Sequence, residues 1–180
     1  MKLGFKTEET YTDVNSLRYS PKKNGKELGS LKPAKPHRDT WASNIFHQIN
    51  WWMPMHDVSK ENSIFIAPNY YKKSIKNNSS TWKYKTYKSK KNYLSLPISK
   101  VIIKNNEKES FKIKCGEILC FSGNHLHGSN LGKSHRLNIE TRTVSKNDDL
   151  IYDVPKNIDS NNKVIQNKWF KNIKSNCFLT

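Results

Sequence analysis

The chain has 180 residues, of which 32 are Lys or Arg and 15 are Asp or Glu, so its formal net charge is +17. This length predicts one domain, residues 1–180, and argues against two independent domains. The sequence contains no apolar run of about 18 residues and no signal-peptide pattern, which predicts a cytoplasmic protein without a membrane span. The three cysteines match no CxxC spacing, so they indicate neither a disulfide framework nor a zinc knuckle.

Lysine dominates the basic residues, because arginine occurs at four positions and 32 − 4 leaves 28 lysines. A basic excess attracts phosphates and polyanions at long range. A composition rich in Lys and Asn produces the same excess without a partner, and we favour this second interpretation. Where lysine is the default cation, an arginine indicates a site that needs a planar, bidentate group. The four positions are Arg18, Arg38, Arg136 and Arg142.

The first 36 residues are polar and interrupted by Pro and Gly, with one short strand predicted at Leu17–Tyr19. The run Ile45–Met53 is rich in β-forming residues and stops at Pro54, so we predict a central strand that is buried on both faces. A further short strand is predicted at Ser63–Ala67. Alternation in the central strand places three side chains on one face: Gln48, Asn50 and Trp52.

Residues 70–98 change character, because aromatic side chains are interleaved with lysines. Aromatic faces next to ammonium groups suit a nucleotide, a phosphorylated sugar or a single-stranded nucleic acid. An exposed basic loop has the same composition, and we favour that interpretation. The aromatic members are Tyr70, Tyr71, Trp82, Tyr84, Tyr87 and Tyr93, and the lysines are Lys72, Lys73, Lys76, Lys83, Lys85, Lys88, Lys90 and Lys91.

Four more strands are predicted in the second half of the chain, at Val101–Ile103, Phe111–Lys114, Ile118–Phe121 and Arg136–Val144. Many short strands separated by Gly, Pro and Asn indicate an antiparallel β-barrel or sandwich, with few short helices. The tail after Lys146 is weakly patterned, and a short helix is predicted near Val164–Ile173. The polar side chains that share one face of the last strand are Arg136, Asn138, Glu140 and Arg142.

An H-x-D motif at His37 and Asp39 is the strongest functional signal in the sequence. Residues two apart on an extended strand point to the same face, so these two side chains can bind one metal ion together. The β-type segment 116–127 ends in two histidines and predicts a second strand that supplies the third ligand, His127 or His125. Two imidazoles and one carboxylate on one face of an octahedral ion leave three positions open, which is the arrangement of non-haem Fe(II) oxygenases.

These residues resemble the Fe(II)/2-oxoglutarate-dependent dioxygenase superfamily and, within it, the phytanoyl-CoA dioxygenase-like group. The family's His-Gly-Ser element matches His127 better than His125, and the basic residue of its late strand matches Arg136. The resemblance implies a double-stranded β-helix, a cupin-like jelly roll, over about residues 17–145, followed by a C-terminal extension at 146–180. The segments that carry the resemblance are residues 37–41, 48–54, 62–68 and 116–138.

The resemblance also implies an activity, the hydroxylation of a C–H bond by O2 with 2-oxoglutarate as cosubstrate and succinate and CO2 as coproducts. A carboxylate among the metal ligands favours hydroxylation over halogenation. The stretch of Lys and Tyr leads us to expect a small anionic metabolite as the substrate. The predicted Fe(II) ligands, which are also the catalytic residues, are His37, Asp39 and His127, and the predicted contacts of 2-oxoglutarate are Arg136, Asn138, Gln48 and Asn50.

Three alternatives stay open. A nucleic-acid dealkylating dioxygenase has a pattern similar to that of Arg136, Asn138 and Arg142 and acts on a base that a basic surface helps to bind. A cupin-like isomerase or a non-catalytic metal-binding barrel uses His125 and His127 as an H-x-H pair. A basic nucleic-acid-binding β-module binds no metal at all. The sequence does not determine the oligomeric state.

Overall fold

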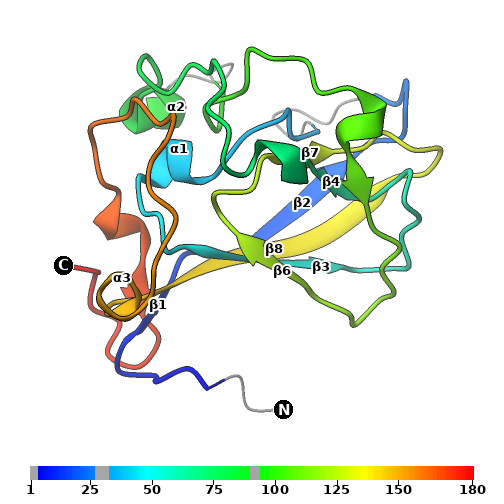
Figure 1. Ribbon diagram of the computed structural model, residues 1–180. Coiled ribbons are helices and arrows are strands. Elements are labelled where there is room, and N and C mark those ends of the chain that lie inside the picture. The colour runs from blue at the N-terminus through cyan, green and yellow to red at the C-terminus, as the bar shows by residue number, and fades with distance from the viewer. Residues whose placement is uncertain (1–3, 27–32, 90–93) are drawn as a thin grey trace.

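The computed structural model describes residues 4–26, 33–89 and 94–180, and two antiparallel sheets form its framework (Figure 1). The larger sheet has the strand order β6-β3-β8-β1-β9, with β2 also paired to β8, and the smaller sheet has the order β5-β4-β7. The strands are β1 Thr10–Thr12, β2 Ser16–Ser20, β3 Ile49–Pro54, β4 Ile64–Ile66, β5 Glu109–Ser110, β6 Leu119–Ser122, β7 His127–Ser129, β8 Arg136–Ser145 and β9 Lys171–Asn172.

The helices of the described residues are short and lie at the ends and edges of the sheets (Figure 1). None of them has both the length and the apolar character that crossing a bilayer requires. The α-helices are α1 Thr40–Ser43, α2 Tyr84–Ser89 and α3 Asp148–Ile151, and the 3₁₀ turns are η1 Pro68–Tyr70, η2 Asn105–Glu107 and η3 Asn167–Trp169.

Apolar side chains from both sheets meet between them. Trp52 of β3 and Phe121 of β6 pack with Ile64 and Ile66 of β4 in one buried cluster. Each of these strands alternates its side chains, so the polar residues of the same inner face are directed into the space between the sheets. The fold therefore surrounds a few polar groups with an apolar wall.

The central strand differs from its prediction. It begins at Ile49 rather than Ile45, because Asn44 adopts the left-handed conformation (φ 56°) that ends α1 and the chain then turns before it can pair. Asn50 and Trp52 are buried, as the alternation predicts, but the side chains of the opposite face are half-buried. The prediction that both faces are buried was wrong, because the structure places its second layer on one side of the sheet only.

Several predicted strands are confirmed, and others are not. The predictions around β2, β4, β6 and β8 hold within a few residues. No strand forms at Val101–Ile103, where Val101 bonds to the Ser99 hydroxyl and Ile102 is 88% exposed. The segment Phe111–Lys114 makes a single bridge, between Ile113 and Val58, because the neighbouring strand β4 pairs with Glu109–Ser110 instead.

Residues 146–180 pack against the large sheet. Strand β9 pairs with β1, and Phe170 is completely buried in a cluster with Tyr11 and Val144. The helix predicted at Val164–Ile173 was wrong, because this segment forms η3 and then β9. The C-terminal residues thus belong to the core that supports β1 and β8.

Candidate metal centre

One backbone bridge places the two histidines side by side. The amide of His37 donates to the carbonyl of His127, and the amide of His127 donates to the carbonyl of His37, both at 2.9 Å. The spacing predicts that Asp39 lies on an extended strand. In the structure it precedes α1 and has helical dihedrals (φ −64°, ψ −31°). The turn into this helix brings the carboxylate back toward His37, so the predicted pair forms through a helical turn rather than a strand.

The three side chains converge on one point. Nε2 of His37 lies 3.5 Å from one oxygen of Asp39, and Nε2 of His127 lies 3.9 Å from the other. All three residues are buried, and one candidate ligand atom from each lies within 4.8 Å of the other two. The sequence prediction brought together the same three residues.

Hydrogen bonds fix the orientation of both imidazoles. Nδ1 of His37 lies 2.7 Å from the carbonyl of Lys35, and Nδ1 of His127 lies 2.9 Å from the carbonyl of His125. A carbonyl can only accept, so each Nδ1 carries the proton and each Nε2 presents a lone pair. Two lone pairs and a carboxylate that face one another repel unless a cation lies between them, and this carbonyl-bound orientation is typical of metal-binding histidines.

Burial controls the charges of these groups. Burial and the neighbouring His37 together lower the pKa of His127 to about 4, so this imidazole is neutral at pH 7. Burial alone would raise the pKa of Asp39, but the positive charge of Arg142 helps to hold it well below its ordinary value. The cluster therefore presents the Nε2 atoms of two carbonyl-bound imidazoles and one carboxylate, which is a set of donors that a divalent metal can bind.

Asn50 and Gln48, which the sequence predicts as contacts of the cosubstrate, form a chain of amides that ends on the carboxylate of Asp39. Nδ2 of Asn50 donates to Asp39 at 2.5 Å, and Nε2 of Gln48 donates to Oδ1 of Asn50 at 2.9 Å. This chain of amides fixes the rotamer of Asp39, and Oε1 of Gln48 is buried without a partner among the described residues. A direct contact of either amide with a cosubstrate stays a prediction.

His125 lies outside the cluster. The segment predicted as one strand over 116–127 is two strands, because β6 ends in the large sheet and β7 begins in the small one. His125 occupies the turn between them, where Nδ1 lies 3.2 Å from the carbonyl of Ser122 and the ring lies 4.5 Å from that of Tyr71. The spacing predicts that residues 125 and 127 share a strand face, and the structure shows that they do not.

Arg136 is a buried guanidinium whose partners are neutral. It donates to the carbonyls of Asn62 and Ser63, to the hydroxyl of Ser129 and to Oδ1 of Asn138, at 2.9 to 3.2 Å. No carboxylate of the described residues forms an ion pair with it. Burial accordingly lowers the pKa of Arg136 to about 10. The arginine is held in place by hydrogen bonds but keeps an uncompensated charge.

Two polar atoms on the same inner face lack a partner among the described residues. They are the hydroxyl of Ser20 and Nδ2 of Asn138, and both are buried. Ser20 lies directly opposite Arg136 in the pairing of β2 with β8. A buried donor without a partner costs about 1–3 kcal/mol. Sequence reasoning did not identify Ser20, because its role depends on the register of a strand from the polar N-terminal segment.

Asp13 and Arg142 extend the charged cluster beyond the three ligands. Nε of Arg142 donates to Asp13 at 2.5 Å, and Nη1 of the same guanidinium lies 3.9 Å from Asp39. Burial raises the pKa of Asp13, while Arg142 opposes this effect. Asp13 is isolated in the sequence before β2, so nothing in the pattern of residues could have linked it to the centre.

The middle residue of the H-x-D motif points away from the centre. Arg38 is 1% exposed, forms an ion pair with Asp159 at 3.2 Å and donates to the carbonyls of Tyr70 and Lys73. Asp159 also accepts from the indole of Trp41 at 2.7 Å. Two buried charges that satisfy each other in this way connect the motif to the C-terminal segment.

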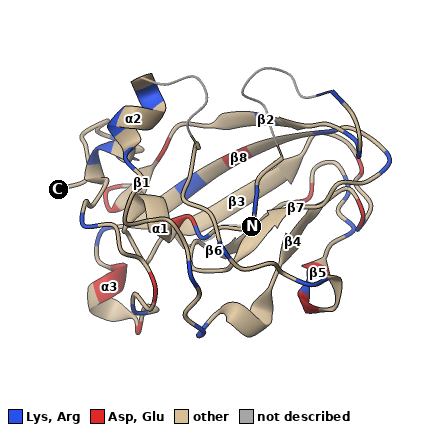
Figure 2. Cartoon of the chain, turned by 90° about the horizontal axis from the view of Figure 1, so that it is seen from above, with Lys and Arg blue, Asp and Glu red and all other residues tan. Residues whose placement is uncertain are grey.

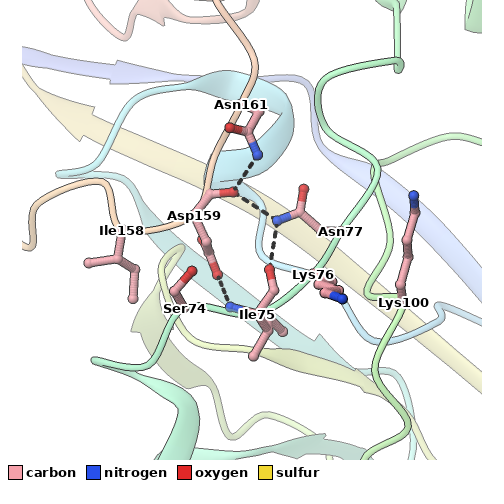
Figure 3. Close-up of a pocket in the computed structure, with 8 residues that line it drawn as sticks. All are labelled: Ser74, Ile75, Lys76, Asn77, Lys100, Ile158, Asp159 and Asn161. Carbon is pink, nitrogen blue, oxygen red and sulfur yellow. Dashed lines mark hydrogen bonds between the residues drawn. The ribbon is translucent and has the colours of Figure 1, made fainter.

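Two cavities lie elsewhere on the molecule, and neither is lined by the three ligands. The first, of about 420 Å³, is lined in part by Lys76, Lys100 and Asp159 (Figure 3), and the second, of about 940 Å³, in part by Lys60, Lys108 and Ser129. In the first, the polar groups bond to one another: the carboxylate of Asp159 accepts from the amide of Ile75, and its carbonyl accepts from Asn77 (Figure 3).

No protein-family model and no curated protein matches the sequence. Solved structures do match the fold. A structure described as the apo form of ThoJ, a non-heme monooxygenase, is 12% identical with a TM-score of 0.50, and the match covers 77% of this chain and 48% of that one. EvdO2 from Micromonospora carbonacea var. aurantiaca, solved with 2-oxoglutarate, is 10% identical with a TM-score of 0.52, and the match covers 77% and 53%.

These similarities show a fold, mainly β with few short helices, that 2-oxoglutarate-bound and non-heme oxygenase structures share. The match spans only about half the length of those structures. The predicted oxygenase-type fold is therefore confirmed at the level of architecture. The jelly-roll topology and the phytanoyl-CoA dioxygenase-like group stay predictions.

Proposed function

We propose that the protein is an Fe(II)- and 2-oxoglutarate-dependent oxygenase that hydroxylates a C–H bond of a small metabolite with an anionic group, releasing succinate and CO2. The observation that carries this proposal is the orientation of His37 and His127, whose Nε2 lone pairs face Asp39 while backbone carbonyls hold their other nitrogens. Two imidazoles and one carboxylate form the ligand set of non-haem Fe(II) oxygenases.

Each residue has a definite task in this centre. His37 and His127 would bind Fe(II) through Nε2, and Asp39 would bind it through a carboxylate oxygen. Asn50 keeps that carboxylate in place through its amide. Bound Fe(II) and 2-oxoglutarate supply the activation of O2, which the side chains alone cannot perform. The apolar wall of Trp52 and Phe121 excludes water from the reacting groups.

Arg136 supports the choice of cosubstrate. Its buried charge has no carboxylate partner among the described residues, and the free Nδ2 of Asn138 and the hydroxyl of Ser20 lie on the same face. One carboxylate would accept from all three groups and compensate the charge. We assign these residues to the carboxylate of 2-oxoglutarate that lies far from the metal.

The test is the optical charge-transfer band that forms when Fe(II) and 2-oxoglutarate bind together without O2. We expect the band in the unaltered protein and in His125→Ala, and its loss in His127→Ala. The two variants remove the same side chain two residues apart, so they form a matched pair. Absence of the band in the unaltered protein contradicts the proposal.

Nucleic-acid dealkylation is the second candidate, favoured by the common inner face of Arg136, Asn138 and Arg142 on β8. Figure 2 shows Lys and Arg on α2, on β8 and in several of the loops around the sheets. Binding of single-stranded DNA that falls steeply with salt, together with 2-oxoglutarate turnover stimulated by methylated bases, would favour this candidate.

A further inference from the structure

The inner face of β8 is buried near Arg136 and partly exposed farther along the strand. Arg136 and Asn138 are 4% and 1% exposed, while the side chains of Arg142 and Glu140 are 24% and 35% exposed. Arg142 also lies 3.9 Å from Asp39. The partly exposed part of this face is therefore the route by which a substrate can approach the candidate centre.

Arg18 stands next to Glu140 on this route. Arg18 of β2 lies opposite Asn138 in the strand pairing, its side chain is 40% exposed, and its Nε donates to Glu140 at 2.6 Å. Glu140 raises the pKa of Arg18 most, and Asp39 contributes to the same shift. We call Arg18, Glu140, Arg142 and Trp169 the rim.

The rim offers a guanidinium for a negative group of a ligand and a carboxylate for a positive group. The terminal nitrogens of Arg18 make no hydrogen bond with any described residue, so four N–H donors are available. The carboxylate of Glu140 uses one oxygen, Oε1, in its bond with Arg18. Three of the four arginines of a lysine-rich chain lie on this face, as expected where planar groups bind carboxylates.

The charges of the rim are balanced once its neighbour Asp13 is included. Arg18 is paired with Glu140 and Arg142 with Asp13, so two cations meet two anions. A polyphosphate or a nucleic-acid backbone would find little net attraction there, because each added negative charge also approaches Glu140 and Asp13. A ligand group with one carboxylate and one ammonium fits the adjacent Arg18 and Glu140, since each charge finds the opposite sign.

Trp169 adds an aromatic wall to the rim. The guanidinium of Arg142 lies 5.5 Å from the centre of the Trp169 ring, and the centre of the Tyr84 ring on α2 lies 4.9 Å from the same point. The indole is only partly buried, and its Nε1 lacks a partner among the described residues. The part of the indole that these neighbours leave exposed offers an apolar surface to a ring of the ligand.

We propose that the substrate is a free α-amino acid with an aromatic ring, whose carboxylate binds Arg18, whose ammonium group binds Glu140 and whose ring packs on Trp169. This inference rests on the proposed function for the reaction, but the binding step rests on the rim alone. It also limits the role of the charge of +17, because Asp13 balances the excess positive charge of the rim.

Four compounds test the inference by removing one feature at a time: L-phenylalanine, 3-phenylpropionate without the ammonium group, phenethylamine without the carboxylate, and L-alanine without the ring. Calorimetry is carried out on the protein loaded with Fe(II) and 2-oxoglutarate without O2. We expect L-phenylalanine to bind at least about tenfold more tightly than each of the others. For 3-phenylpropionate and phenethylamine this factor corresponds to the loss of one charge-assisted contact, and for L-alanine to the loss of the contact with Trp169.

Variants assign each contact. Arg18→Gln should weaken L-phenylalanine and 3-phenylpropionate by about tenfold but leave phenethylamine unchanged, and Glu140→Gln should weaken L-phenylalanine and phenethylamine but leave 3-phenylpropionate unchanged. Trp169→Leu should abolish the advantage of L-phenylalanine over L-alanine. Lys168→Gln is the matched control, since this exposed neighbour lies outside the rim.

Two results overturn the inference: no binding of L-phenylalanine to protein that forms the charge-transfer band, or binding that Arg18→Gln and Glu140→Gln leave within about twofold of the control. If the band is absent but L-phenylalanine binds with the predicted pattern, the proposed function fails and the amino-acid site stands. The two proposals therefore fail separately.

Discussion

His37 and His127 exchange two backbone hydrogen bonds, each of 2.9 Å, and the centres of their rings lie 4.3 Å apart. The bridge joins the segment before α1 to the first residue of β7. Backbone pairing therefore brings the two imidazoles together. A preformed centre of this kind takes the position of two of its candidate ligands from the fold.

A preformed centre should lose its metal through single substitutions while the fold survives. We expect His37→Ala and Asp39→Ala to weaken Fe(II) or Co(II) binding by roughly 100-fold or more, beyond the roughly 10- to 100-fold typical of residues that only hydrogen-bond to a metal ligand. Far-UV circular dichroism should stay unchanged. Metal titration in the absence of O2 measures the affinity, and His125→Ala should match the unaltered protein. Equal affinity of Asp39→Ala and the control would exclude Asp39 as a ligand.

The metal-free protein should lose stability as the pH falls below the ordinary histidine range. Folding lowers the pKa of His127 from 6.5 to about 4, so between these values the unfolded chain binds a proton that the folded chain does not. The stabilisation is complete above pH 6.5 and is lost as the pH falls toward 4, by on the order of 3 kcal/mol. Urea unfolding at several pH values in the presence of a chelator measures this loss. His127→Gln should flatten the profile, and an equally steep profile in this variant would assign the effect to other groups.

The hydroxyl of Ser20 should contribute to cosubstrate binding. Ser20→Ala removes one predicted donor to the 2-oxoglutarate carboxylate and should raise its dissociation constant by about tenfold, the value of one charge-assisted hydrogen bond. Ser16→Ala on the same strand is the matched control, because its hydroxyl bonds to the carbonyl of Val14. Arg136→Lys should weaken binding further, since a point charge cannot replace the planar fork. A tenfold effect in Ser16→Ala as well would indicate a general disturbance of β2.

Asp159→Asn should be among the most destabilising substitutions of the C-terminal segment. It leaves the guanidinium of Arg38 buried without its ionic partner, which costs about 3–5 kcal/mol. For a chain of this length the midpoint of thermal unfolding should fall by roughly 10 °C. Asp153→Asn, at an exposed position nearby, should change it little. Thermal melts of the two variants decide the question, and similar melts would mean that the ion pair contributes nothing.

Local patterns in the sequence predicted the existence and approximate positions of strands β2, β3 and β8. They failed at Val101–Ile103, where one apolar residue is buried, one is partly buried and one is exposed. They also failed at segment 116–127, where one β-type run is divided between two sheets. Which strand finds a partner depends on the whole fold, and no local pattern records it. Residues predicted in the aromatic stretch at Lys90, Lys91 and Tyr93 lie outside the described residues.

The candidate site was predictable where a motif carried it. His37, Asp39 and His127 meet as predicted, although a helical turn rather than a strand positions Asp39. Asp13 and Ser20 were missed, because their relation to the centre arises from strand register alone. Trp169 was missed as well, since a weakly patterned tail gave no sign that it reaches the sheet.

The ion pair between Arg38 and Asp159 has a consequence for the order of events during synthesis. Each segment that supplies a candidate ligand leaves the ribosome before residue 159 does, yet the guanidinium of Arg38 has no ionic partner until Asp159 follows. Residues 37–39 should therefore reach their buried arrangement only after Asp159 has been synthesised.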